Sequence, residues 1–255
     1  MKVSEIMTGD VITIDRNRSL KDATELMQKN KVSKLVVVKE KKMAGVLTYK
    51  DITKTLGSVR EKVSPAHLHV AGAFSDDPVT VTPDTDIKAA AALMLKHNIS
   101  SLPVVEKDEL KGIITKTDLI KTIKSKEQVK TMMIKPICVS PDDRIIHALK
   151  VIADYDISSV PVVKDNQLTG VISRKELSLA MENFREHIDK QHQNARLENL
   201  VVSSVMKPEP QTATPKMTLT EAAEIMAKHR LSGLPVSENG KLVGIITKTD
   251  LIKAI

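Results

Sequence analysis

The chain has 255 residues, with 39 Lys and Arg against 32 Asp and Glu, which gives a formal net charge of +7. Its 41% hydrophobic and 28% charged residues indicate a globular protein of one large or two ordinary domains. Aromatic residues make up only 2%, so the core must be aliphatic. The single cysteine, Cys138, excludes an intramolecular disulfide and a cysteine-rich metal site, and we expect it to be buried. No apolar run is long enough for a membrane span or a signal-peptide core, which favours a soluble, cytoplasmic protein.

The elements of one unit follow from the apolar pattern. A capping signal at Ser19 predicts a helix with Leu20, Ala23, Leu26 and Met27 on its apolar face. In the next unit, residues 79–82 form a short β-like run that Pro83 should end, because proline cannot donate to a ladder. Residues 102–105 and 112–115 then flank a polar turn and predict a β-hairpin, and a second helix starts near Asp118. The predicted order is β-α-β-β-α.

This unit occurs four times. Each copy has a stretch of Gly, two aliphatic residues, a hydroxyl, two spacers and an acid, at 45–51, 112–118, 170–176 and 244–250. Twelve residues before each Gly lies a serine: Ser33, Ser100, Ser158 and Ser232. Because the register holds without a gap in all copies, chance does not explain it, and one unit is too small to bury its sheet alone. We therefore expect the copies to pair.

The motif residues closely resemble those of the cystathionine-β-synthase (CBS) domain. The resemblance rests on the run 98–105 followed by 112–118, and four copies cover nearly the whole chain, at 1–60, 71–124, 125–182 and 201–255. The layout is similar to that of the gamma subunit of AMP-activated protein kinase. The resemblance implies an α+β fold of four β-α-β-β-α repeats, paired into two Bateman modules at 1–124 and 125–255.

The resemblance also implies a ligand: AMP, ADP, ATP or S-adenosylmethionine, bound in clefts between paired repeats. In the family motif the acid holds the ribose, which here names Asp51, Asp118, Asp250 and, more weakly, Glu176. The hydroxyls on the phosphate side are Thr48, Thr115, Ser173 and Thr247. Neighbouring cations that can add to phosphate binding are Lys50, Lys116, Arg174 and Lys248. The apolar positions for adenine are Ile12, Val32, Val79, Ile99, Ile137, Ile157 and Leu231.

Each of these residues also has a simpler structural explanation. A carboxylate binds both hydroxyls of a ribose well, but Thr-x-x-Asp at a strand-to-helix junction is also a capping box. The aliphatic positions are core residues first. Copy 3 departs from the pattern, because Glu176 reaches one methylene further than Asp, so its site should be the weakest. Copies 2 and 4, with Asp118 and Asp250, carry the full motif.

The sequence favours a non-catalytic regulatory protein that binds an adenosine-type ligand and signals to a protein partner. A second copy of the chain is a further candidate partner. We find no nucleophile–base constellation, phosphate loop or dinucleotide motif that would indicate an enzyme. His67 and His69 have no further metal ligands at suitable spacing, so no metal or other cofactor is expected.

The alternative is a basic factor that binds RNA or the ribosome. Its motivation is the net charge and a lysine-rich stretch with one acid, Glu127: Lys121, Lys124, Lys126, Lys130 and Lys135. The chain is rich in both signs of charge and poor in aromatic residues on which bases stack, so a solvated surface explains the lysines more simply.

Overall fold

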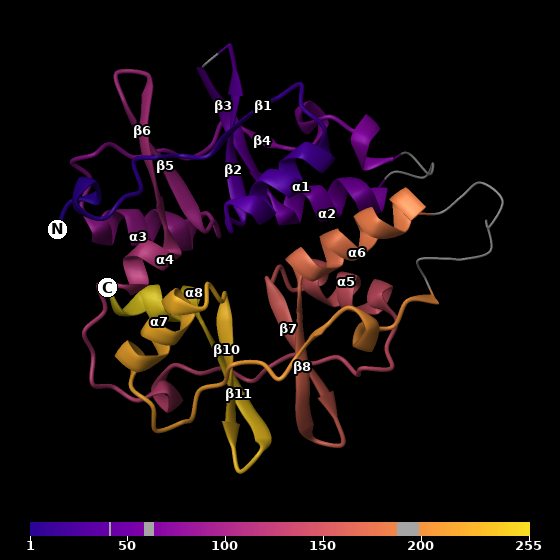
Figure 1. The fold of residues 1–255 in the computed structure, drawn as a ribbon. Coiled ribbons are helices and arrows are strands. Elements are labelled where there is room, and N and C mark those ends of the chain that lie inside the picture. Colours follow the sequence, from indigo (N-terminus) through magenta and orange to yellow (C-terminus); the bar gives the residue numbers. More distant parts are fainter. Residues whose placement is uncertain (41, 59–63, 188–198) are drawn as a thin grey trace.

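The computed structural model describes residues 1–40, 42–58, 64–187 and 199–255. Four β-hairpins point outward, two at the top and two at the bottom of Figure 1, and their helices face one another across the middle. We number the repeats by these hairpins: copy 1 has β2–β3, copy 2 β5–β6, copy 3 β7–β8 and copy 4 β10–β11. The α+β fold of four repeats is confirmed, and every copy has the helix, hairpin and second helix of the predicted order. No described helix is long and apolar enough to cross a membrane.

The strands and helices have the following bounds. The strands are β1 Thr13–Asp15, β2 Lys34–Lys39, β3 Lys42–Thr48, β4 Ser75–Asp76, β5 Ser101–Glu106, β6 Glu109–Thr115, β7 Ser159–Lys164, β8 Gln167–Ser173, β9 Lys207–Pro208, β10 Gly233–Glu238 and β11 Lys241–Thr247. The helices are α1 Leu20–Lys29, α2 Tyr49–Ser58, α3 Ile87–Lys96, α4 Lys116–Ile120, α5 Ile145–Asp154, α6 Arg174–His187, α7 Leu219–Lys228 and α8 Lys248–Leu251.

Local sequence accounts for the hairpins and the helix starts. Each hairpin is antiparallel and turns through residues in the left-handed region, such as Asp165 and Asn166 in copy 3. Ser19 caps α1 by accepting a hydrogen bond from Asp22 N, while the Asp22 carboxylate accepts from Ser19 N. Thr218 and Glu221 repeat this capping box at α7, as the sequence predicts.

The short strand before each proline position forms in copy 1 alone among the described residues. There β1 pairs with β2 in parallel, and Arg16 N donates to Val38 O. In copies 2 to 4 a proline stands at the position of Arg16 and cannot make this bond. The predicted strand at 79–82 is therefore reduced to a single parallel bridge between Val81 and Val104, and copies 3 and 4 have equivalent bridges.

Adjacent copies exchange their opening segments. Residues 1–9 pack on copy 2, where Thr8 pairs with Ile113, and residues 64–76 pack on copy 1, where β4 pairs with β3. Copies 3 and 4 repeat the exchange through β9 and the bridge of Ile134 to Ile245. The exchanged segment explains why the motif has a glycine. A Cβ on Gly112 would lie 2.8 Å from Met7 Sδ and 2.9 Å from Thr8 O, two atoms of that segment. The glycine lets the exchanged segment cross the hairpin.

Copies 2 and 4 face each other across the middle of the molecule, as do copies 1 and 3, and these two halves of the molecule pack differently. Copies 2 and 4 share one apolar core, in which α4 packs against α7 and α8. Copies 1 and 3 have separate apolar clusters, and Met181 of α6 packs into the cluster of copy 1. The two copies meet where α2 packs against α6, with a polar contact between Thr53 of α2 and Ser178, and a second one between Thr24 of α1 and Glu182. The prediction for Cys138 is wrong: this residue is exposed, because its chain segment forms only one bridge to the copy 3 hairpin, at Val139.

Candidate functional site

The four motif acids lie at the starts of α2, α4, α6 and α8, and each caps its own helix. One carboxylate oxygen of Asp118 accepts from Thr115 N at 2.9 Å and from Thr115 Oγ1 at 2.7 Å. Asp250 does the same with Thr247 at 3.0 and 2.6 Å, and Asp51 with Thr48 at 2.8 and 2.6 Å. Glu176 takes the same two bonds from Ser173. The capping explanation therefore holds in every copy, and it uses one oxygen of each acid.

The second carboxylate oxygen is placed differently in the four copies. In copies 2 and 4 it lies near a lysine three residues on: Lys121 Nζ is 3.6 Å from Asp118 Oδ1, and Lys253 Nζ is 3.0 Å from Asp250 Oδ1. The Glu176 carboxylate pairs with Lys207 at 3.2 Å. Both lysines beside the aspartates are more than half exposed, so these surface pairs contribute little energy and are easily exchanged for another partner.

Copies 2 and 4 exchange their phosphate-side lysines. Lys116, which follows the motif threonine of copy 2, donates to Thr249 Oγ1 of copy 4 at 2.9 Å. Lys248 returns the contact to Thr117 Oγ1 at 2.6 Å. The charge of Asp250 acts on Lys116, and that of Asp118 acts on Lys248. Each lysine therefore lies at the helix start, and beside the motif acid, of the facing copy.

A third lysine reaches the same place from copy 1. Lys34, at the start of β2, donates to Ser100 Oγ at 2.8 Å and to Ser100 O at 3.0 Å. Burial, together with the charges of Lys248 and Lys116, lowers the pKa of Lys34 to about 7. Burial also lowers the pKa of Lys248 to about 8. We call Lys34, Lys116 and Lys248 the lysine cluster; three ammonium groups held this close repel one another unless an anion lies between them.

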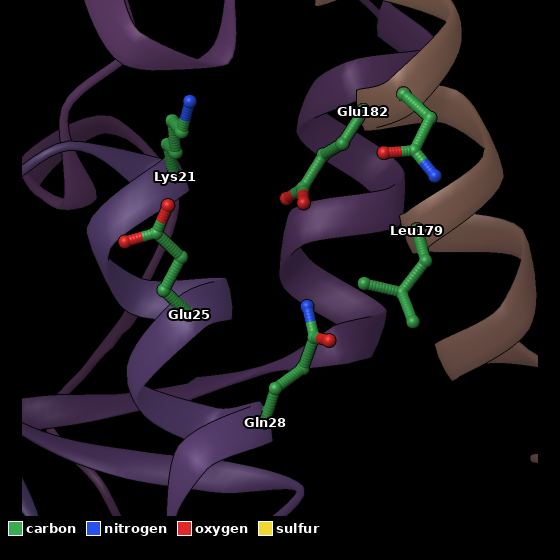
Figure 2. A pocket seen from close by; sticks show the side chains of 6 residues that line it. Lys21, Glu25, Gln28, Leu179 and Glu182 are labelled. Atoms are coloured by element: carbon green, nitrogen blue, oxygen red, sulfur yellow. The ribbon is translucent and has the colours of Figure 1, made fainter.

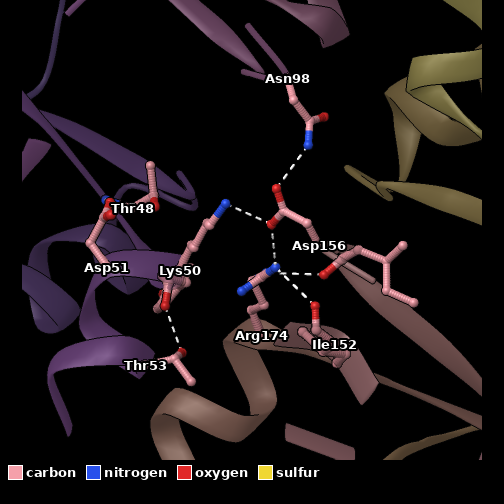
Figure 3. Close-up of polar contacts among 10 residues, drawn as sticks. Thr48, Lys50, Asp51, Thr53, Asn98, Ile152, Asp156 and Arg174 are labelled. Atoms are coloured by element: carbon pink, nitrogen blue, oxygen red, sulfur yellow. Dashed lines mark hydrogen bonds and ion pairs between the residues drawn. The ribbon is translucent and has the colours of Figure 1, made fainter. Parts of the chain in front are cut away.

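The cations of copies 1 and 3 have a carboxylate partner instead. Lys50 Nζ lies 2.6 Å from Asp156 Oδ1, and Arg174 Nη2 lies 2.9 Å from the same oxygen. Figure 3 shows both side chains converging on Asp156, with Asn98 on its other oxygen. The motif pair Thr48 and Asp51 lies to one side of this group. The structure thus divides the predicted phosphate-side cations into two unlike sets.

The seven apolar positions expected to line an adenine slot share one property: none is fully buried and none is exposed. They are Ile12, Val32, Val79, Ile99, Ile137, Ile157 and Leu231. Six of them pack at the edge of an apolar core rather than inside it: Ile12, Val32, Val79, Ile99, Ile157 and Leu231. A partly covered aliphatic surface is suited to packing against a flat ring such as adenine.

Two hollows of the described surface lie elsewhere, beside α6. One is lined by α1 and α6, with Glu25 and Gln28 facing Leu179 and Glu182 (Figure 2). The other also borders α6, where it shares Leu179 and Asn183 with the first, and extends toward Leu200 and Val205. Glu176 lines the second hollow, and no other predicted site residue lines either. Among the described residues no group of His, Cys, Asp and Glu could hold a metal ion, and His69 Nδ1 instead contacts Asn17 O at 2.8 Å.

Sequence reasoning missed two residues of this region, Lys34 and Asp156. Each stands at a fixed place in the repeat: Lys34 directly follows the motif serine, and Asp156 lies two residues before it. Only copy 1 has a cation directly after the motif serine, and only copy 3 has an acid two residues before it. The five lysines of the stretch from Lys121 to Lys135 are all exposed.

Comparison with known proteins identifies the family of the repeat. A CBS domain model matches residues 3–58, 70–125, 128–183 and 202–255. The chain therefore belongs to the CBS domain family, as a protein with four CBS repeats.

Some relatives match over nearly the full length and others over about half of it. Protein MJ1225 of Methanocaldococcus jannaschii, whose function is uncharacterized, is 25% identical over 274 residues, covering 99% of this chain and 97% of the relative. Its crystal structure, that of a proposed archaeal homolog of the AMP-activated kinase gamma subunit, has a TM-score of 0.87 at 24% identity and covers 99% of both chains. An uncharacterized conserved protein from Pyrococcus horikoshii has a TM-score of 0.65 at 25% identity, again covering 99% of both. The structure of CBSX2 in complex with AMP covers 50% of this chain and 94% of CBSX2, with 26% identity and a TM-score of 0.42.

Proposed function

We propose that this chain is a non-catalytic regulatory protein that binds an adenine nucleotide where copies 2 and 4 meet, and that a protein partner reads the bound state. Membership of the CBS family supports an adenosine-type ligand. Asp118 and Asp250 are the proposed ribose acids. Thr115, Thr247 and the lysine cluster lie on the proposed phosphate side, and the half-buried Ile99 and Leu231 would contact adenine.

The observation that carries this proposal is the lysine cluster. Three ammonium groups from three copies meet in a partly desolvated place, and two of them have a pKa lowered to about 7 and about 8. A phosphate between them would remove their mutual repulsion, and charge-assisted bonds of this kind are about twice as strong as neutral ones. The cluster thus favours AMP, ADP or ATP over S-adenosylmethionine, whose sulfonium would add a fourth positive charge.

Ligand binding has to break existing contacts. The motif acids would give up their weak lysine pairs, and Lys116 and Lys248 would turn from the threonines of the facing copy toward phosphate oxygens. The contacts of Lys116 and Lys248 join copies 2 and 4, so a nucleotide that replaces them changes how these two copies are held together. A ligand shifts such an equilibrium only by its differential affinity for the two states.

The test is thermal unfolding with a ligand panel. We expect AMP, ADP or ATP to raise the melting temperature, because a ligand at a hundred times its Kd stabilises by about 2.7 kcal/mol, and adenosine and S-adenosylmethionine to do less. Asp118→Asn and Asp250→Asn together should remove most of the gain. Asp22→Asn is the matched control, because Asp22 caps α1 with the same geometry and lies outside the lysine cluster. Equal loss of the gain in the control, or no gain with any nucleotide, would refute the proposal.

A further inference from the structure

Asp156 receives donors from three copies of the repeat. Lys50 of copy 1 reaches Oδ1 at 2.6 Å, Arg174 of its own copy reaches the same oxygen at 2.9 Å, and Asn98 Nδ2 of copy 2 reaches Oδ2 at 2.8 Å (Figure 3). Burial alone would raise the pKa of this carboxyl, but the hydrogen bond and charge of Lys50, with Arg174 and Asn98, hold the pKa below its ordinary value. Asp156 is therefore a fixed negative charge.

The repeat places this carboxylate. Asp156 lies just past the end of α5 in the left-handed region, with φ 45°, two residues before the motif serine. The same position in the other copies is also left-handed and holds Lys31, Asn98 and Arg230. Asp and Asn tolerate this backbone better than most residues. Of the four equivalent positions, the one in copy 3 is the only acid.

Arg174, which pairs with the Asp156 carboxylate, points in another direction than the lysines at the same repeat position. Arg174 stands directly after the motif hydroxyl, where copies 2 and 4 have Lys116 and Lys248. Those lysines cross to the facing copy. Arg174 turns back instead: its Nε donates to Ile157 O at 3.0 Å and its Nη2 to Ile152 O at 3.1 Å, besides the bond to Asp156. Only 13% of its side chain is exposed, so the guanidinium is held where it is.

We propose that Asp156 is an internal anion that takes the place of a ligand phosphate in the half formed by copies 1 and 3, so that phosphate-bearing ligands bind only in the half formed by copies 2 and 4. The inference rests on the proposed function. Lys50 and Arg174 are the cations available on the phosphate side of copies 1 and 3, and one carboxylate partners both. Among the described residues the lysine cluster makes no ion pair with a carboxylate, although the charges of Asp118 and Asp250, the proposed ribose acids, act on it.

A ligand phosphate in copies 1 and 3 would have to displace a tethered carboxylate, which is present at very high effective concentration. It would also approach a fixed negative charge. Removing that charge removes both the competing carboxylate and the repulsion. It also leaves Lys50 and Arg174 close together without an anion, and the two cations repel each other until an anion binds between them. Neutral Asp156→Asn keeps the shape and the contact with Asn98.

The experiment measures the number of AMP molecules bound per chain by calorimetric titration, for the wild type, Asp156→Asn and the double variant Asp156→Asn/Arg174→Met. We expect Asp156→Asn to bind at least one AMP more than the wild type, and the double variant to return to the wild-type number. Adenosine, which has no phosphate, should show no increase in Asp156→Asn. Asn98→Ala is the matched control, because it weakens the same contact between copies and leaves the charge in place, so its count should stay at that of the wild type.

The outcomes separate the two proposals. If the wild type binds AMP and neither Asp156→Asn nor Asp156→Ser gains a site, Asp156 only joins the copies and the inference is overturned, while the proposed function stands. If the wild type binds no nucleotide, the proposed function fails. The inference is then decided by inorganic phosphate: phosphate that raises the melting temperature of Asp156→Asn above any effect on the wild type supports it, and equal shifts overturn it.

Discussion

Replacing Lys34 by methionine should stabilise the unliganded protein. The side chain is half-buried beside Lys116 and Lys248, and its pKa falls from 10.5 to about 7. At about 1.4 kcal/mol per pH unit this corresponds to an upper limit of about 5 kcal/mol. Solvent screening of a partly exposed ammonium and the loss of two hydrogen bonds to Ser100, about 1 kcal/mol each, reduce the net gain to about 1–2 kcal/mol. For a chain of this length that raises the melting temperature by about 2–6 °C.

The stability difference between Lys34→Met and the wild type should depend on pH. Below pH 7 Lys34 is protonated in both the folded and the unfolded state, so the full cost of burying its charge is present. Between pH 7 and 10.5 the unfolded chain keeps a proton that the folded chain has lost, so wild-type stability rises with pH. The advantage of Lys34→Met should therefore shrink from pH 6 to pH 9.

Calorimetric melting at pH 6, 7 and 9 measures both effects. Lys39→Met is the control, because Lys39 is exposed at the far end of the same strand. The reasoning is wrong if Lys34→Met is less stable than the wild type at pH 7, or if the difference between them does not change with pH.

Two further predictions concern pH and packing. Nucleotide affinity should fall as pH rises from 6.5 to 8.5, because Lys34 and Lys248 lose protons near pH 7 and 8. Calorimetric titration in buffers of different ionisation enthalpy should detect proton uptake on binding. An affinity that does not change over this range would contradict a role for the lysine cluster. Gly112→Ala should destabilise by about 1–3 kcal/mol, because its Cβ would meet Met7 and Thr8 closer than 3.0 Å, whereas Gly57→Ala, with open space in α2, should be neutral or stabilising in the same denaturant titration.

Local patterns explain why so much of the fold could be predicted. The hairpin turns and the capping boxes at Ser19 and Thr218 depend on residues a few positions apart, and these features are confirmed. The exposed Cys138 was predicted wrongly, because an alternating apolar run does not reveal how few partners its strand will find. The exchange of opening segments also escaped prediction, although the motif glycine is its signature.

The site was harder to predict than the fold. Lys116 and Arg174 occupy the same repeat position, and the sequence suggests the same role for both. Their directions differ because Thr249 of the facing copy accepts one, while Asp156 and the end of α5 hold the other. A register alignment names the residues at such a position. Which of them meet across copies depends on how the halves pack, and that is decided by side chains far apart in the chain.

The exchange of opening segments has a consequence for how the protein is made. The first nine residues complete a hairpin that follows them by about a hundred positions, and residues 64–76 complete one already synthesised. Neither repeat of a pair covers its own apolar edge, so copy 1 can be finished only after residues 64–76 have emerged from the ribosome, and residues 1–9 must wait for the hairpin of copy 2. The same geometry lets two chains trade these segments at high concentration, which would yield an intertwined dimer from an unchanged set of contacts.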